Sequence, residues 1–261
     1  MPTFCISDLH LCDRGPRDNF AYNGREGRFF DFLDFVAASQ GRLIVLGDLF
    51  DWWQVNVSDS VLAYLPLIDR LAAMNAIYVV GNHDCALTKF IGNVLMPAHP
   101  IFQRCRRAFE ETIGSRRFAF LHGHEADPYC RDMNPGTGEI TAIISGILED
   151  RNKGPFRRGH AVEDEFVGTL ESALTIWRTL TFQHGRLAEM IDGVEAYHRE
   201  AGAQVVVYGH THEPGQIGNH HFNTGCWARQ QDTFVRIEDD GTASVWQWEE
   251  GGPTPYEHSL K

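Results

Sequence analysis

Residues 205–215 read VVVYGHTHEPG, and this stretch decides the fold that we expect. It begins with β-branched residues that do not alternate with polar ones, which is typical of a strand buried on both faces of a sheet. The run ends at Tyr208 and Gly209, and two histidines, His210 and His212, follow with one residue between them. A buried strand that ends in two imidazoles raises the question of what those imidazoles bind.

Four other short apolar runs also end in polar side chains. They are TFCISDLH with Asp8 and His10, RLIVLGDLFD with Asp48 and Asp51, AIYVVGNHD with Asn82, His83 and Asp84, and RFAFLHGHE with His122 and His124. Taken singly, a histidine on a strand is most often packed and an aspartate after a strand is most often a helix cap. Because ligands of open α/β folds gather outside the carboxyl ends of the strands, we expect these side chains to meet.

Helical patterns separate the strand-like runs. One helix has an apolar face made of Phe29, Phe32, Leu33, Val36 and Ala37, and Gly41 can end it. A second has the apolar face Val61, Leu62, Leu65 and Ile68, with Ser58 as its expected N-cap. Pro66 should kink or break this second helix. Alternating strands and helices predict an α/β fold.

A long interval interrupts this alternation. The distance from His122 to His210 is 88 residues, whereas the earlier strand ends are 34 to 40 residues apart. We therefore predict a core of residues 1–125 and 204–250 with a helical insertion, residues 126–203, that forms a lid. Two apolar stripes support helices there: Phe166, Leu170, Leu174, Trp177 and Leu180, then Leu187, Met190, Val194 and Tyr197.

The insertion also contains a basic loop, RNKGPFRRGH, with Arg157 and Arg158. These side chains could contact a phosphate of the substrate, or the loop could be a solvated surface and the helices part of the core. Beyond the insertion, residues 233–248 predict a β-hairpin that turns near Asp240 and Gly241. We expect the tail, residues 251–261, to be poorly ordered.

Composition limits the class of protein. The chain has 261 residues, 43% of them hydrophobic, and a net charge of −12. Nucleic acid is an unlikely partner for so acidic a chain, because phosphate contacts need lysine and arginine. The sequence has no apolar stretch of membrane-spanning length and no signal-peptide pattern at its start, which predicts a cytoplasmic location.

The strand ends together offer more metal ligands than one ion needs. Seven donors of oxygen and nitrogen type are Asp8, His10, Asp48, Asn82, His122, His210 and His212. Such a mixed set suits two divalent transition-metal ions that share a carboxylate, and burying it without metal would be costly. Manganese is the first expectation, with iron or zinc as alternatives. A pair of ions about 3.5–4 Å apart activates water for attack on phosphorus.

In chain order, DLH, GDLFD, GNHD, the single His122 and GHTH resemble the five signatures of the calcineurin-like metallophosphoesterase superfamily. The resemblance implies two β-sheets flanked by helices and a hydrolase that uses a metal-bridging hydroxide. It implies that Asp8, His10, Asp48 and His212 hold one ion, and that Asp48, Asn82, His122 and His210 hold the other. It further implies that His83 is catalytic and that Asp51 orients it.

Within the superfamily, SDLHLC, GDLFDWW and FNTGCW resemble the branch of UDP-2,3-diacylglucosamine pyrophosphatases. This implies a phosphorylated small-molecule or lipid-linked substrate, with peripheral membrane contact, and His124, Arg157 and Arg158 are expected to contact that substrate. The chain differs from this branch at His83, where an arginine is usual, and at His124, where an acidic residue is usual. A general phosphomonoesterase or phosphodiesterase, including a nuclease, is therefore the alternative, and a non-catalytic scaffold is a remote one.

Overall fold

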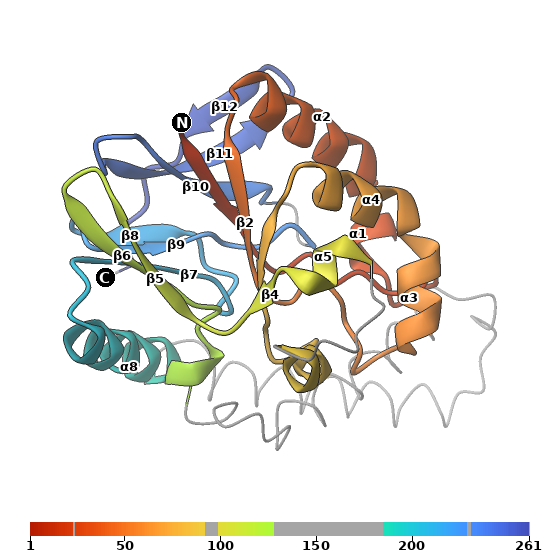
Figure 1. Cartoon of the computed structure of the whole chain (residues 1–261), viewed down its shortest axis with the longest axis horizontal. Helices are drawn as coiled ribbons and strands as arrows, with labels where there is room; N and C mark the ends of the chain where they lie inside the picture. The colour runs from red at the N-terminus through yellow and green to blue at the C-terminus, as the bar shows by residue number, and fades with distance from the viewer. Residues whose placement is uncertain (23, 92–98, 128–184, 229–230, 261) are drawn as a thin grey trace, which may run out of the picture.

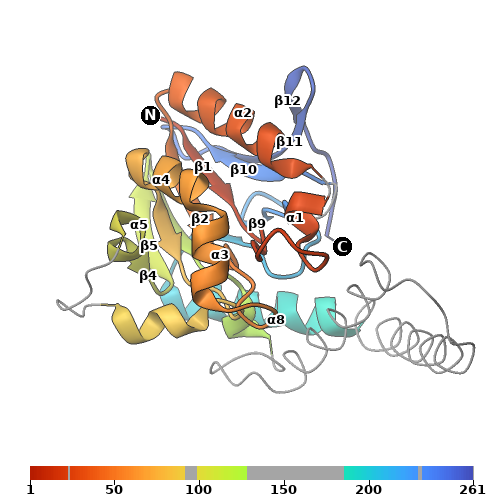
Figure 2. The same ribbon diagram turned by 90° about the vertical axis from the view of Figure 1, so that its right-hand side faces the viewer.

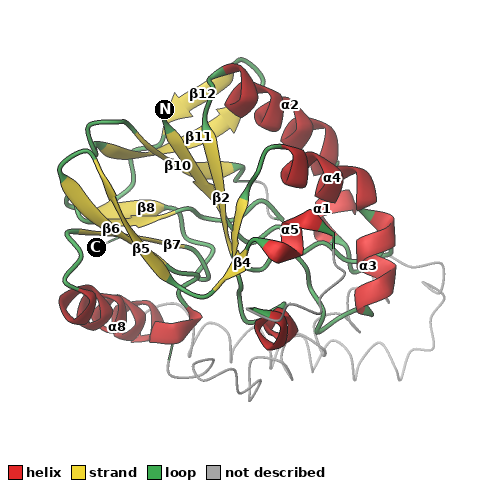
Figure 3. Cartoon of the chain, in the orientation of Figure 1, coloured by secondary structure: helices red, strands yellow, loops and turns green. Residues whose placement is uncertain are grey.

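The computed structural model describes residues 1–22, 24–91, 99–127, 185–228 and 231–260. In these residues two mixed β-sheets lie face to face, and helices cover both outer faces (Figure 1, Figure 3). The predicted two-sheet architecture flanked by helices is confirmed.

The first sheet has the strand order β12-β11-β10-β1-β2-β3-β4. Its parallel half contains β1 (Thr3–Ile6), β2 (Arg42–Leu46), β3 (Ile77–Val79) and β4 (Cys105–Arg106). Its antiparallel half contains β10 (Thr233–Ile237), β11 (Ala243–Glu249) and β12 (Gly252–Pro255). β10 and β11 are the predicted hairpin, with Gly241 in its turn at a φ of 86°.

The second sheet has the order β5-β6-β7-β9-β8. Its strands are β5 (Phe109–Ile113), β6 (Arg116–Phe120), β7 (Val205–Tyr208), β8 (Gly215–Ile217) and β9 (His221–Asn223). β7 runs parallel to both of its neighbours, β6 and β9, so it is central, as its uninterrupted apolar sequence indicates.

Three apolar layers follow from the alternation of side chains along the strands. On β1, Phe4 and Ile6 point to the helices, while Cys5 points to the second sheet. On β7, Val205 and Val207 point to the first sheet, and the opposite face packs on helix α8 (Gly185–Ala201). The order of layers is therefore helices, first sheet, second sheet and helix.

The helices over the first sheet are α1 (Asn19–Tyr22), α2 (Arg25–Ala38), α3 (Val57–Ala63), α4 (Leu65–Ala73) and α5 (Pro100–Gln103) (Figure 2). α2 buries the predicted residues Phe29, Phe32, Leu33 and Val36. The amide of Gly41 binds the carbonyl of Val36 where α2 ends. Two 3-10 turns, Cys85–Phe90 and His124–Ala126, follow β3 and β6.

The second predicted helix is two helices. The break falls at Tyr64, and Pro66 lies in the first turn of α4, where its missing N–H costs nothing. The predicted apolar face is wrong in part, because Leu62 is 71% exposed and Leu65 is 39% exposed. After the break α4 buries the predicted residue Ile68 and, beside it, Leu67 and Leu71. The N-cap of α3 is Asn56 rather than Ser58.

The tail differs from the expectation of poor order. β12 pairs with β11. Further along the tail, the amide of Gln216 on β8 donates a hydrogen bond to the carbonyl of His258 at 3.0 Å. Leu260 is buried against the second sheet. These backbone bonds and the buried side chain of Leu260 hold a segment that the sequence predicted to be poorly ordered.

Most of the predicted lid, residues 128–184, lies outside the described residues, and so do Arg157, Arg158 and the first apolar stripe. The described end of the insertion is α8, which buries Met190 and Val194 on the outer face of the second sheet. This end of the insertion therefore contributes to the core. Among the described helices, none has the length and apolarity that a bilayer crossing requires.

Candidate metal centre

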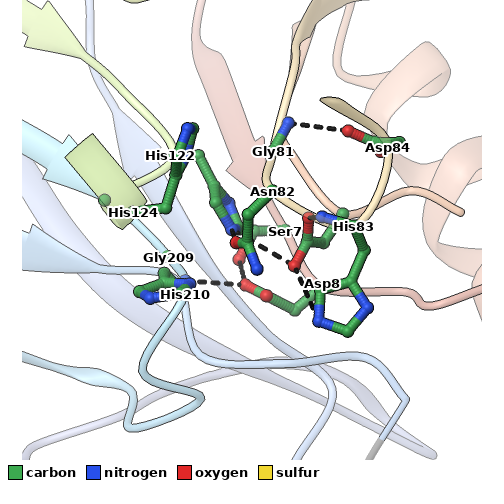
Figure 4. A network of polar contacts seen from close by, with 12 residues as sticks. Ser7, Asp8, Gly81, Asn82, His83, Asp84, His122, His124, Gly209 and His210 are labelled. Atoms are coloured by element: carbon green, nitrogen blue, oxygen red, sulfur yellow. Dashed lines mark hydrogen bonds and ion pairs between the residues drawn. The ribbon is translucent and has the colours of Figure 1, made fainter. Parts of the chain in front are cut away.

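The polar side chains of all five strand ends meet at one end of the two sheets. Figure 4 shows four of these ends, with Asp8, Asn82, His122 and His210. The first sheet supplies Asp8 and His10 after β1, Asp48 after β2 and Asn82 after β3. The second sheet supplies His122 after β6, and His210 and His212 after β7. Most oxygen donors thus come from one sheet and most imidazoles from the other.

Two glycines allow the loops to approach so closely. A Cβ on Gly209 would lie 2.1 Å from the hydroxyl of Ser7, and one on Gly81 would lie 2.1 Å from Asp48 Oδ1. No side chain fits at such distances, so packing requires glycine at positions 81 and 209.

Five of the seven predicted ligands have left-handed backbone conformations. The φ angles are 56° for Asp8, 49° for His10, 50° for Asp48, 68° for His210 and 58° for His212. Non-glycine residues rarely adopt this region, which costs on the order of 1–3 kcal/mol each and is found mainly at functional sites. These five residues lie in the loops after β1, β2 and β7.

One group of donors contains Asp8, His10 and His212, whose ligand atoms lie within 4.8 Å of one another. His212 Nε2 is 3.1 Å from Asp8 Oδ1 and 3.1 Å from His10 Nε2. Asp8 is fully buried, while the side chains of His10 and His212 are 12% and 19% exposed. We call this group the outer position.

A second group contains Asp48, His122 and His210, again within 4.8 Å of one another. His122 Nε2 lies 3.2 Å from Asp48 Oδ2 and 3.0 Å from Asn82 Oδ1, which adds the amide oxygen to this group. His122 Nδ1 donates to the carbonyl of Leu46 at 2.7 Å. We call this group the inner position.

Asp48 lies between the two positions. Its Oδ2 is 3.2 Å from His122 Nε2 of the inner position and 3.9 Å from His10 Nε2 of the outer position. A carboxylate, an amide oxygen and several imidazoles facing one space form a donor set that fits transition-metal ions. Asp48 thus faces donors of both positions.

The buried carboxyls of this cluster are held in their ionised forms. Burial disfavours the charge on Asp8, but His212 and His10 beside it keep its pKa well below the ordinary value. Burial likewise opposes ionisation of Asp48, and His122 and His83 nevertheless lower its pKa strongly. Burial lowers the pKa of His122, yet Asp48 outweighs it and raises this pKa to about 10. Opposite charges therefore compensate one another within the cluster.

His83 lies at the edge of the two positions, and the side chains of Asp51 and Trp53 hold its imidazole. Its Nδ1 is 2.7 Å from Asp51 Oδ1, and its Nε2 is 3.9 Å from Asp48 Oδ2. The indole of Trp53 stacks on the imidazole at a centroid distance of 3.8 Å. Burial opposes ionisation of Asp51, but His83 and His10 lower its pKa, so Asp51 is a carboxylate that can accept the N–H of His83 Nδ1.

Asp84, the last residue of GNHD, faces away from the donors and joins two loops. It accepts the amides of Gly81 at 2.7 Å and Leu49 at 2.9 Å, and the hydroxyl of Tyr78 also binds it. Burial raises the pKa of Asp84 to about 6, with the charge of Asp48 adding to this effect. The contacts give Asp84 a role in holding the loops after β2 and β3 together.

His124, expected to contact substrate, is buried beside the inner position. It is 2% exposed, its ring centroid is 5.4 Å from that of His122, and its Nδ1 is 3.5 Å from Glu125 Oε2. Burial lowers the pKa of His124 to about 4, which keeps it neutral near pH 7. Its expected contact with substrate stays a prediction.

Sequence reasoning did not single out three residues that contact the cluster: Ser7, Trp53 and Asp127. The Ser7 hydroxyl binds Asp8 and Thr224, Trp53 stacks on His83, and Asp127 Oδ2 lies 2.8 Å from His210 Nε2. The WW pair after GDLFD was a usable signal for Trp53. No sequence signal pointed to Asp127, because it follows the end of β6 by seven residues and lies at the edge of the predicted insertion.

Comparisons with known proteins agree with this geometry. Residues 1–214 match the family model described as calcineurin-like phosphoesterase. A UDP-2,3-diacylglucosamine hydrolase of Aromatoleum aromaticum is 26% identical over 97% of this chain and 95% of its own length. Another protein of that name, from Sodalis glossinidius, is 25% identical over 82% of this chain and 83% of its own length.

Among solved structures, a dimetal phosphatase from Danio rerio covers 98% of this chain and 97% of its own, with a TM-score of 0.50 and 15% identity. This likeness concerns the fold. The family match spans all five strand ends and most of the chain. The chain therefore belongs to the calcineurin-like phosphoesterase family and is a hydrolase of phosphoesters or pyrophosphates.

Proposed function

We propose that the chain binds two divalent transition-metal ions and uses them to hydrolyse a nucleotide-linked lipid pyrophosphate. Asp8, His10 and His212 would hold the ion at the outer position, and Asn82, His122 and His210 would hold the ion at the inner one. Asp48 would be shared. The observation that carries the proposal is the position of Asp48, whose Oδ2 lies 3.2 Å from His122 Nε2 and 3.9 Å from His10 Nε2. Manganese is our first expectation, and iron or zinc would suit the same donors.

When bound, the two ions lower the pKa of a water molecule and neutralise charge on the phosphoryl group. The chain's own contribution is a positioned proton donor. Asp51 binds His83 Nδ1 at 2.7 Å and Trp53 packs on the ring, so Nε2 is the nitrogen left for the substrate. From there His83 would donate a proton or a hydrogen bond to the oxygen that leaves phosphorus.

Two relatives named UDP-2,3-diacylglucosamine hydrolase, at 25% and 26% identity over most of both chains, support that compound or a close analogue as the substrate. The net charge of −12 counts against nucleic acid. His83 and His124 replace an arginine and an acidic residue that the resemblance leads one to expect. A related nucleotide-linked or lipid-linked substrate is therefore included in the proposal.

The test is a substrate panel on protein reconstituted with manganese. The panel contains UDP-2,3-diacylglucosamine, an aryl phosphomonoester and an aryl phosphodiester, and elemental analysis gives the metal content. We expect about two ions per chain and the highest kcat/KM on the pyrophosphate. Higher kcat/KM on an aryl ester would favour a general phosphomonoesterase or phosphodiesterase. Full activity of chelator-treated protein without metal would contradict the metal mechanism itself.

The basic loop of the insertion can be tested separately. Neutralising Arg157 and Arg158 together should raise KM for the nucleotide-linked lipid and leave aryl phosphates unaffected, if these arginines contact a second phosphate. Neutralising Arg116 and Arg117, which lie on β6, is the control, because their side chains bind Asn219 and Glu110. Equal KM changes for both substrates would indicate that the loop is a solvated surface.

A further inference from the structure

Asp127 is a buried carboxylate that the five strand-end motifs do not include. It follows the 3-10 turn His124–Ala126, and its amide donates to the carbonyl of His124 at 3.1 Å. The residue is 0% exposed, and its Oδ2 lies 2.8 Å from His210 Nε2. A buried carboxylate of this kind needs a hydrogen-bonded partner, and this imidazole supplies one.

The contact leaves His210 with one nitrogen for the inner position. His210 belongs to the donor group with Asp48 and His122, whereas no donor group found in the described residues contains Asp127. An imidazole that donates one N–H to a carboxylate is fixed in tautomer and ring orientation, and its second nitrogen becomes a better metal ligand.

We propose that Asp127 is a positioning residue that accepts the N–H of His210 Nε2 and thereby presents His210 Nδ1 to the inner metal ion. The inference rests on the proposed dinuclear centre and names a support that the seven ligands do not include. It also explains how the two histidines of GHTH diverge. His210 Nε2 is bound to Asp127, while His212 Nε2 lies 3.1 Å from Asp8 Oδ1.

The loop after β6, residues 122–127, places Asp127 beside His210. The close approach of the loops after β6 and β7 requires Gly123, with a φ of 119°, since a Cβ there would lie 3.2 Å from the Cβ of His210. The backbone then turns through His124–Ala126 and brings Asp127 back to His210. Residues 122–127 thus supply both a ligand, His122, and the support of a second ligand.

The test measures metal affinity of the full chain carrying Asp127→Ala or Asp127→Asn. Dissociation constants for both ions come from competition with a chelator, and cobalt substitution reports ligand geometry through its visible absorption spectrum. Asp127→Ala should weaken binding of the inner ion about 10–100-fold, leave the affinity for the outer ion unchanged and alter the cobalt spectrum. Asp127→Asn should weaken it less, because the amide oxygen can still accept the N–H.

A matched control and a double variant isolate the effect. Asp232 is 2% exposed and binds Arg25 and Arg28, so Asp232→Ala should lower stability without changing either metal affinity. In the background of His210→Ala, adding Asp127→Ala should change the metal affinity no further. A further loss there would mean that Asp127 is itself a ligand and would overturn the proposal.

The outcomes separate this inference from the proposed function. If the unmodified chain binds two ions and both Asp127 variants bind them with unchanged affinity, Asp127 has no positioning role while the dinuclear centre stands. If the unmodified chain binds no ion, the dinuclear proposal fails first. Should Asp127→Ala fail to fold, an unchanged affinity and cobalt spectrum for Asp127→Asn would still contradict the inference.

Discussion

The inner and outer positions of the candidate centre are built from similar donors and differ in how those donors are held. At the inner position His122 is fully buried, and its Nδ1 donates to a backbone carbonyl at 2.7 Å. His210 is bound to Asp127 at 2.8 Å. At the outer position His10 Nδ1 has Asp51 at 3.7 Å, beyond hydrogen-bond length, and His212 is 19% exposed.

This difference teaches that similar donors can form two sites that are held differently. Imidazoles whose far nitrogen is hydrogen-bonded keep their orientation before a metal arrives, so less ordering accompanies binding. His212 of the outer position, at 19% exposed compared with 10% for His210 of the inner position, is the donor most open to water and chelators. We therefore expect the inner ion to be held more tightly and the outer ion to exchange.

The strongest way to break the comparison is to remove what the two positions share. Asp48→Asn keeps the size of the side chain and removes the charge that faces both groups. We expect metal content well below the two ions of the unmodified chain and loss of nearly all turnover, measured by elemental analysis and a hydrolysis assay. A variant that kept both ions would show that Asp48 is not shared.

His83→Ala should separate chemistry from metal binding. Its imidazole is held by Asp51 and Trp53 at the edge of the cluster. We expect turnover to fall about 10²–10⁴-fold with both ions still bound, because a positioned proton donor contributes about that much. Loss of an ion from this variant would instead place His83 in a donor group with His10 and Asp48, which lie close enough to form one.

Staged removal of metal tests the comparison directly. Treatment with increasing chelator should release the two ions in two phases, with affinities at least about 10-fold apart. His212→Ala should remove the weaker phase and leave the tighter one, whereas His122→Ala should affect the tighter one. Release of both ions in a single phase would show that the two positions are equivalent.

The smallest expected effect concerns Trp53. Its indole stacks on His83, and aromatic pairs of this kind contribute about 0.5–1.5 kcal/mol. Trp53→Ala should lower kcat up to about 10-fold without loss of metal, and Trp53→Phe should restore most of it. Trp52→Phe is a neighbouring control, because Trp52 packs on Phe50 and binds Ser60 away from the donors. If Trp53→Ala has the kcat of the unmodified chain, the stacking does not position His83.

Much of the fold could be predicted because its signals are local. The apolar runs that became β1, β2, β3, β6 and β7 needed no partner to be recognised, since strands buried on both faces are apolar throughout. The face of α2 follows the helical period. The face of the next predicted helix was wrong in part because the helix breaks at Tyr64 and Pro66 lies in the first turn of a second helix, so the helical period does not continue across the break.

The tail shows the opposite case. Its Gly- and Pro-containing sequence has no strand pattern, yet β12 pairs with β11 and Leu260 fills a place beside Gly215. Sheet pairing is a contact between segments, so an edge strand can be specified mainly by its neighbour. No window of the tail sequence contains that information.

The sequence by itself determined which residues could be ligands, because carboxylates, an amide and imidazoles follow five buried strands at their carboxyl ends. Only the tertiary structure decided which of them face each other, how Asp48 comes to lie between two groups, and that five of the seven adopt positive φ angles. It alone brought Asp127 to His210 and Trp53 to His83. The physical reason is that ligand type is a property of one residue, whereas orientation, burial and support arise only when distant segments pack together.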